Sequence, residues 1–168
     1  MEYGNEEIQR YTDIINSIPK KDPKYNIADT YTVRGKAYEI LWEKKKVVAD
    51  YTNAIKHKKN NVLAYKFRAN LYDLNEEHTN AINDYSMLIK YEKENTEVYL
   101  RRGTCYEKIW EYKKAIADYE NTVKISDEYR PVYLNIGVCY MYLEKYKEAI
   151  KNLSLAEKYD PEDIRAKK

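Results

Sequence analysis

Four copies of one pattern follow each other along this chain, each 34 residues after the last. Five columns of the pattern hold identical or chemically similar residues in all four copies. The columns are Tyr31, Tyr65, Tyr99 and Tyr133; Gly35, Ala69, Gly103 and Gly137; Tyr38, Tyr72, Tyr106 and Tyr140; Val47, Ala81, Ala115 and Ala149; and Tyr51, Tyr85, Tyr119 and Leu153. Such self-similarity predicts a repeat array, in which each unit packs only on its neighbours.

The spacing inside each copy is helical. In the third copy, Tyr99, Gly103 and Tyr106 share one face of a first helix, and Ala115 and Tyr119 share one face of a second. A 34-residue period built on Tyr-x-x-x-Gly/Ala-x-x-Tyr, then Ala, then Tyr, resembles the tetratricopeptide repeat, a helix–turn–helix unit. The resemblance implies an all-α fold, an α-solenoid of antiparallel helix pairs in a right-handed superhelix. The expected parts are an N-terminal helix and linker at 1–27, four units at 28–61, 62–95, 96–129 and 130–163, and the start of a truncated next helix at 164–168.

Both ends of the chain depart from the period. Residues 6–18 read as a helix that resembles the second helix of a unit, and Pro161 begins a helix that stops at Lys168. Arrays normally close with a polar capping helix. We therefore expect a fragment of a longer array, whose open end leaves three apolar residues partly exposed for self-association. These residues are Ile150, Leu153 and Leu155.

Composition and charge exclude several classes of partner. The formal net charge is only +2, which argues against a nucleic-acid binder that relies on a basic field. No apolar run approaches the roughly 18 residues of a membrane helix, and the first residues lack the features of a signal peptide. We expect an intracellular, cytoplasmic protein with no nucleic-acid or membrane partner.

The two cysteines, Cys105 and Cys139, stand one repeat apart in a column that faces the packed interior. Free cysteine behaves as a small hydrophobe at such a position. A one-repeat offset separates their Cα atoms by roughly 10 Å, which exceeds the ~7 Å limit for a disulfide. Two buried, reduced thiols are the prediction.

An arginine precedes the Gly/Ala column in three copies, and an aspartate follows it 16 residues later. The fourth copy changes both positions together, to Ile136 and Asn152. This joint change favours a charged hydrogen bond across each helix pair over two independent surface columns. The predicted pairs are Arg34 with Asp50, Arg68 with Asp84, and Arg102 with Asp118.

Catalytic and metal-binding patterns are weak in this sequence. His57 and His78 fall in different columns, and neither Cys-x-x-Cys nor His-x-x-x-His occurs. Carboxylates alternate with lysines at helix-surface spacing, which is typical of a solvated face. We expect no enzymatic activity, no catalytic residue, no metal site and no cofactor.

The resemblance implies that the first helices of successive units line a concave groove. Apolar patches and basic groups alternate there, a pattern that suits a peptide or helix from a partner protein, with Phe67 as the best candidate for a hot spot. The predicted groove residues are Lys36, Leu63, Lys66, Phe67, Asn70, Leu74, Leu100, Arg101, Thr104, Lys108, Leu134, Asn135, Val138 and Tyr142.

Three alternatives to this scaffold hypothesis stay open. Lys66 and Asn70 match two of the five residues of the clamp with which chaperone-binding family members hold a C-terminal carboxylate, but Arg101, Pro131 and Asn135 do not match it. A self-associating structural element is the second alternative. RNA binding is the third and is disfavoured by acidic residues in the groove.

Overall fold

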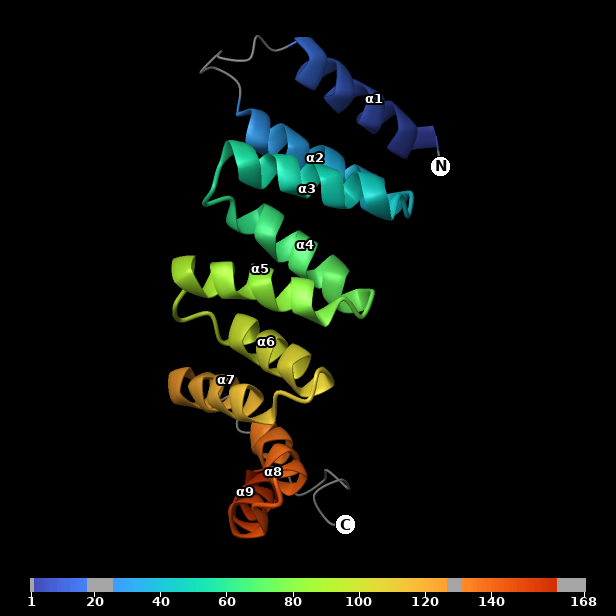
Figure 1. The fold of residues 1–168 in the computed structure, drawn as a ribbon. Helices are drawn as coiled ribbons and strands as arrows, with labels where there is room; N and C mark the ends of the chain where they lie inside the picture. The colour runs from blue at the N-terminus through green and yellow to red at the C-terminus, as the bar shows by residue number, and fades with distance from the viewer. Residues whose placement is uncertain (1, 18–25, 127–130, 160–168) are drawn as a thin grey trace. The chain divides into compact units, whose positions relative to one another are not determined.

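The computed structural model describes residues 2–17, 26–126 and 131–159 (Figure 1). This part of the chain is α-helical and holds no strand, as the all-α prediction requires. The predicted helix from Pro161 lies outside the described residues, as does most of the linker after the first helix. The helices are α1 (Glu2–Ser17), α2 (Ile27–Ile40), α3 (Lys44–His57), α4 (Val62–Leu74), α5 (His78–Tyr91), α6 (Thr96–Lys108), α7 (Tyr112–Ile125), α8 (Tyr133–Tyr142) and α9 (Tyr146–Tyr159).

The helices fall into two compact units, Met1–Leu71 and Tyr72–Lys168. In the first unit α2 packs against α3, and α1 packs on α2 in the place that the second helix of a preceding repeat would take. In the second unit α6 packs against α7 and α8 against α9, while α5 contacts α6 and α7 contacts α8. All of these contacting helices are neighbours in the sequence, as expected for a repeat array.

Asparagine side chains begin three of the first helices. Asn26, Asn61 and Asn95 each accept a hydrogen bond from the backbone N–H three residues later, at 3.3, 3.1 and 3.3 Å. An N-terminal cap of this kind satisfies one of the otherwise unpaired N–H groups of a helix.

The glycine column marks the closest approach of the two helices in a pair. A Cβ atom placed on Gly35 would lie 2.7 Å from the ring of Tyr51, and one on Gly103 would lie 2.8 Å from the ring of Tyr119. Both rings are buried completely or almost completely. The tyrosine 16 residues after each glycine therefore fills the space that the missing side chain leaves.

All four turns between paired helices contain a residue with positive φ that is not glycine. These residues keep the 34-residue step: Trp42, Glu76, Trp110 and Glu144, with φ between 57° and 62°. The left-handed region is unfavourable for residues that carry a Cβ atom. A backbone hydrogen bond closes each turn around this residue, as from Glu111 N–H to the Tyr106 carbonyl oxygen at 2.9 Å.

Candidate functional site

The predicted groove positions of the first unit lie on α2 and α4. The Lys36 ammonium lies 4.6 Å from the centroid of the Phe67 ring, within the range of a cation–π interaction. Phe67 is half-buried and packs on Tyr51, with 5.8 Å between the ring centroids. Leu63 is 56% exposed and Lys66 is exposed, whereas Asn70 is half-buried.

Phe67 therefore has a packing role in addition to any binding role. It joins the buried cluster of Val47, Tyr51, Ala54 and Ala64. Truncating its ring would remove core contacts as well as a binding surface. Leu63 is the better probe of this surface, because most of its side chain is free of the core.

The predicted groove positions of the second unit lie at the end of α4 and on α6 and α8. The buried Tyr119 hydroxyl donates to Glu107 at 2.7 Å, and the Thr104 hydroxyl lies 3.5 Å from it. The Asn135 side chain also hydrogen-bonds the Tyr119 hydroxyl. Leu134 is only 5% exposed and is therefore unavailable to a ligand. The exposed or half-buried positions are Leu74, Leu100, Arg101, Thr104, Lys108, Asn135, Val138 and Tyr142.

Two of these positions already have partners. Arg101 donates to Glu97 at 2.8 Å and also hydrogen-bonds the Tyr85 hydroxyl. The Tyr142 ring stacks on Tyr112 with 4.8 Å between centroids, yet 64% of the residue stays exposed. A ligand carboxylate would have to compete with Glu97 for Arg101, which weakens the carboxylate-clamp alternative.

The charged pairs inside each unit have bidentate geometry. Arg34 donates to both carboxylate oxygens of Asp50 at 2.6 and 2.7 Å, and Arg102 donates to both oxygens of Asp118 at 2.7 and 2.8 Å. The aspartate side chains are only 3% and 4% exposed. Arg68 and Asp84 belong to different units, so their pairing stays a prediction.

Each arginine also reaches a third helix, which the sequence analysis missed. The remaining guanidinium nitrogen donates to a hydroxyl on the preceding helix: Arg34 to Thr12 on α1 at 3.2 Å, and Arg102 to Ser86 on α5 at 3.0 Å. Arg68 forms the matching bond with Thr52 at 2.7 Å. Hydroxyl residues 16 positions before Arg68 and Arg102 were the available signal. One side chain thus joins two repeats.

The fourth copy replaces this network with a shallow pocket. Ile136 and Asn152 occupy the arginine and aspartate columns, and Glu120 occupies the hydroxyl column. These three residues line an open pocket of about 440 Å³ among α7, α8 and α9. The missing arginine accounts for the space.

Both cysteines are buried and free, as predicted. Burial raises the pKa of the Cys139 thiol to about 12. Burial and the nearby Asp73 carboxylate raise the pKa of the Cys105 thiol as well. Neither thiol has the depressed pKa of a nucleophilic cysteine.

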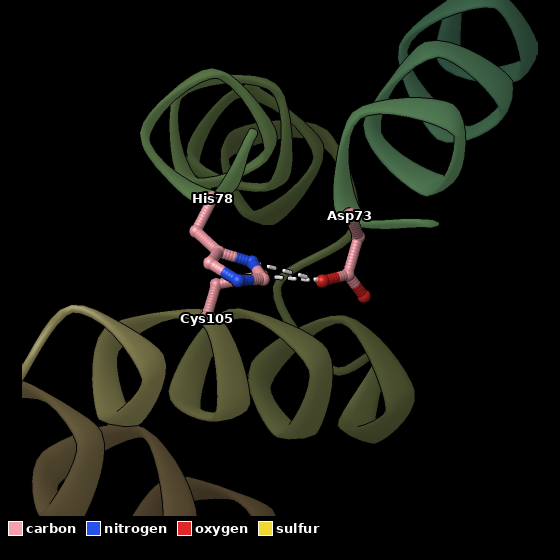
Figure 2. Close-up of side chains that lie close together, drawn as sticks. All are labelled: Asp73, His78 and Cys105. Atoms are coloured by element: carbon pink, nitrogen blue, oxygen red, sulfur yellow. Dashed lines mark hydrogen bonds and ion pairs between the residues drawn. The ribbon is translucent and has the colours of Figure 1, made fainter. Parts of the chain in front are cut away.

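One cluster of metal-ligating side chains was not expected from the sequence. Asp73 at the end of α4, His78 at the start of α5 and Cys105 in α6 converge in the second unit (Figure 2). Their ligand atoms all lie within 4.8 Å of one another. The three residues are separated by 5 and 27 positions in the sequence, which matches neither Cys-x-x-Cys nor His-x-x-x-His.

Helix pairs repeated at a 34-residue step define an α-helical solenoid. Residues 131–163 match the tetratricopeptide repeat family. The column pattern and the helix pairs of the other three copies are similar to this matched unit. No curated protein matches it. None of its described helices combines the length and the apolar character needed to cross a membrane.

Several solved structures share the fold. A crystal structure of MamA is 22% identical, with a TM-score of 0.74, and the alignment covers 92% of this chain and 86% of that one. A tetratricopeptide repeat protein from Parabacteroides merdae ATCC 43184 is 19% identical over 97% of this chain and 69% of its own, with a TM-score of 0.71. The TPR2B domain of yeast Sti1, in complex with pHsp70, is 20% identical over 61% of this chain and 82% of its own, with a TM-score of 0.55.

Proposed function

We propose that this chain is a non-enzymatic protein-interaction module that binds a peptide segment of a partner protein on its first helices. The observation that carries the proposal is the exposure of apolar side chains on these helices. Leu63 is 56% exposed on α4, and Met141 and Tyr142 are 50% and 64% exposed on α8. Exposed apolar side chains beside polar groups favour a binding surface.

The chemistry of each surface indicates the class of ligand. In the first unit, the exposed Lys66 lies on α4 with Leu63 and Phe67, and Lys36 on α2 contacts the Phe67 ring and pairs with Glu39. A peptide with a hydrophobic anchor and an acidic group would satisfy both features. The complex of the Sti1 domain with pHsp70 supports the idea that this fold can hold a protein ligand.

The test is a tagged pull-down from the lysate of the source cell. We would combine Leu63→Asp with Tyr142→Asp, because both side chains are mostly exposed and their replacement spares the core. Ile150→Asp is the matched control, since Ile150 is 66% exposed but lies on the second helix α9. A partner that binds the wild type and the control, and is lost with the double variant, would support the proposal.

Self-association is the second candidate function, and a different observation favours it. Tyr146 and Ile150 are 62% and 66% exposed on α9. Sedimentation equilibrium over a range of concentrations separates the two functions. A concentration-dependent mass that Ile150→Asp abolishes, with no other protein captured, would replace the peptide-binding proposal.

A further inference from the structure

The side chains of Asp73, His78 and Cys105 form a cluster in the second unit (Figure 2). The Cys105 thiol donates to Asp73 Oδ1 at 3.3 Å, and His78 Nδ1 lies 3.4 Å from the same oxygen. Cys105 is completely buried, whereas the His78 and Asp73 side chains are 16% and 26% exposed. The cluster thus has a buried floor and a side that water can reach.

His78 Nδ1 is a buried polar atom without a hydrogen-bond partner in the described structure. Its contact with Asp73 has ion-pair distance but not hydrogen-bond geometry, and it becomes an ion pair only when the imidazole is protonated. Native proteins rarely leave a buried nitrogen unsatisfied. A metal ion would give this nitrogen the partner that it lacks.

We propose that Asp73, His78 and Cys105 bind a divalent transition-metal ion of the zinc type, with the fourth position open to water. An imidazole nitrogen, a thiolate and a carboxylate are the donors that Zn²⁺ takes in proteins, and three protein ligands plus one water is a common zinc arrangement. Hard cations such as Mg²⁺ and Ca²⁺ prefer all-oxygen sites and do not suit this set.

The geometry agrees with this assignment. Two ligands on a tetrahedral zinc ion stand about 3.5 Å apart when each bond is about 2.0–2.3 Å long. The S–O and N–O separations of 3.3 and 3.4 Å are already near that value. Binding would release the proton that Cys105 now donates to Asp73, and the ion would then bridge the two groups.

The neighbouring repeats provide internal comparisons. The same three columns hold Glu39, Lys44 and Leu71 one repeat earlier, and Glu107, Tyr112 and Cys139 one repeat later. In both of these copies the glutamate accepts a hydrogen bond from a buried tyrosine hydroxyl, from Tyr51 at 2.6 Å and from Tyr119 at 2.7 Å.

The middle copy differs at two positions at once. The acid is the shorter Asp73, and a histidine replaces the lysine or tyrosine of the other copies. The equivalent tyrosine, Tyr85, hydrogen-bonds Arg101, which Glu97 also holds at 2.8 Å. Asp73 is therefore directed toward Cys105 and His78, and one copy of the repeat has a complete ligand set.

Co²⁺ and Zn²⁺ titrations of the full chain, stripped of metal with a chelator, test the proposal. We expect one Zn²⁺ per chain by calorimetry, and a Co²⁺ complex with the strong visible absorption of a tetrahedral site and a thiolate-to-cobalt charge-transfer band. Zn²⁺ should also raise the melting temperature, because an ion that binds only the folded state stabilises it.

Matched variants identify the ligands. His78→Tyr copies the residue of the next repeat and should keep the fold, which circular dichroism checks. It should weaken Co²⁺ binding by more than about 100-fold, since changes in residues that merely support a metal ligand already weaken binding 10–100-fold. Cys105→Ser should abolish the charge-transfer band. Cys139→Ser and His57→Gln remove the other cysteine and the other histidine, and both should bind like the wild type.

The proposal is overturned if the folded wild type gives no tetrahedral Co²⁺ spectrum. It is also overturned if His78→Tyr binds as tightly as the wild type, or if either control loses binding as the cluster variants do. Peptide binding through Leu63 and Tyr142 does not depend on these three residues. Failure of one proposal therefore leaves the other intact.

Discussion

The Arg102–Asp118 pair offers a sharp test of how this repeat array is held together. Arg102 joins Asp118 through two hydrogen bonds of 2.7 and 2.8 Å, and its third nitrogen reaches Ser86. The fourth copy shows which residues can replace the pair, because Ile136 and Asn152 occupy the same columns. The informative variants are Arg102→Ile, Asp118→Asn and their combination.

The expected magnitudes follow from burial. Arg102→Ile leaves the Asp118 carboxylate, only 4% exposed, without its cation, and breaking a buried pair in this way costs about 3 kcal/mol. Asp118→Asn removes the charge but keeps one acceptor, and should cost about 2 kcal/mol. Two independent losses would destabilise by about 5 kcal/mol, but we expect about 3 for the double variant, a coupling energy of about 2 kcal/mol.

Urea unfolding followed by circular dichroism gives each free energy. The exposed pair Lys114–Glu111, with side chains 57% and 48% exposed, is the control on the same helix pair. Alanine replacement there should show coupling of less than about 0.5 kcal/mol. A coupling this small for Arg102 and Asp118 would refute the view that the arginine joins the helices.

Two further predictions concern the close helix contact and the turns. Gly103→Ala should destabilise by about 1–2 kcal/mol, because its Cβ would lie 2.8 Å from the Tyr119 ring. Gly137→Ala should cost less, because the half-exposed Leu153 side chain at 2.7 Å can rotate. Equal losses of unfolding free energy in urea would contradict this prediction. Glu144→Gly should stabilise by about 0.5–1 kcal/mol, and Glu144→Val should destabilise, because the residue has a φ of 58°; the order of the melting temperatures decides.

The helix pairs could be predicted from the sequence because the pattern that encodes them occurs four times. A tyrosine 16 residues after a glycine is weak evidence for a helix pair when it occurs once. It is strong evidence when both Gly35 with Tyr51 and Gly103 with Tyr119 show it. The structure shows the reason, since each ring fills the space beside its glycine. Because the same packing requirement recurs in each copy, it appears in the sequence as a column of similar residues.

The burial of groove residues could not be predicted in the same way. A column position places Leu134 and Leu63 on comparable helices, yet Leu134 is 5% exposed and Leu63 is 56% exposed. Likewise, Phe67, the predicted hot spot, also packs on Tyr51 and under Lys36. Exposure depends on the size and direction of neighbouring side chains, which the period does not specify.

The Asp73–His78–Cys105 cluster was missed for the opposite reason. A comparison of columns detects residues that recur in every copy, so a site that occurs in one copy appears only as a departure from the pattern. His78 stands where two other copies have tyrosine, and Asp73 stands where two have glutamate. Either change alone would not indicate a metal site. Only the fold shows that Asp73, at the end of α4, and His78, at the start of α5, both lie beside Cys105 in α6. In a repeat protein, then, simultaneous departures in columns that pack together mark the positions at which one unit can acquire chemistry that the others lack.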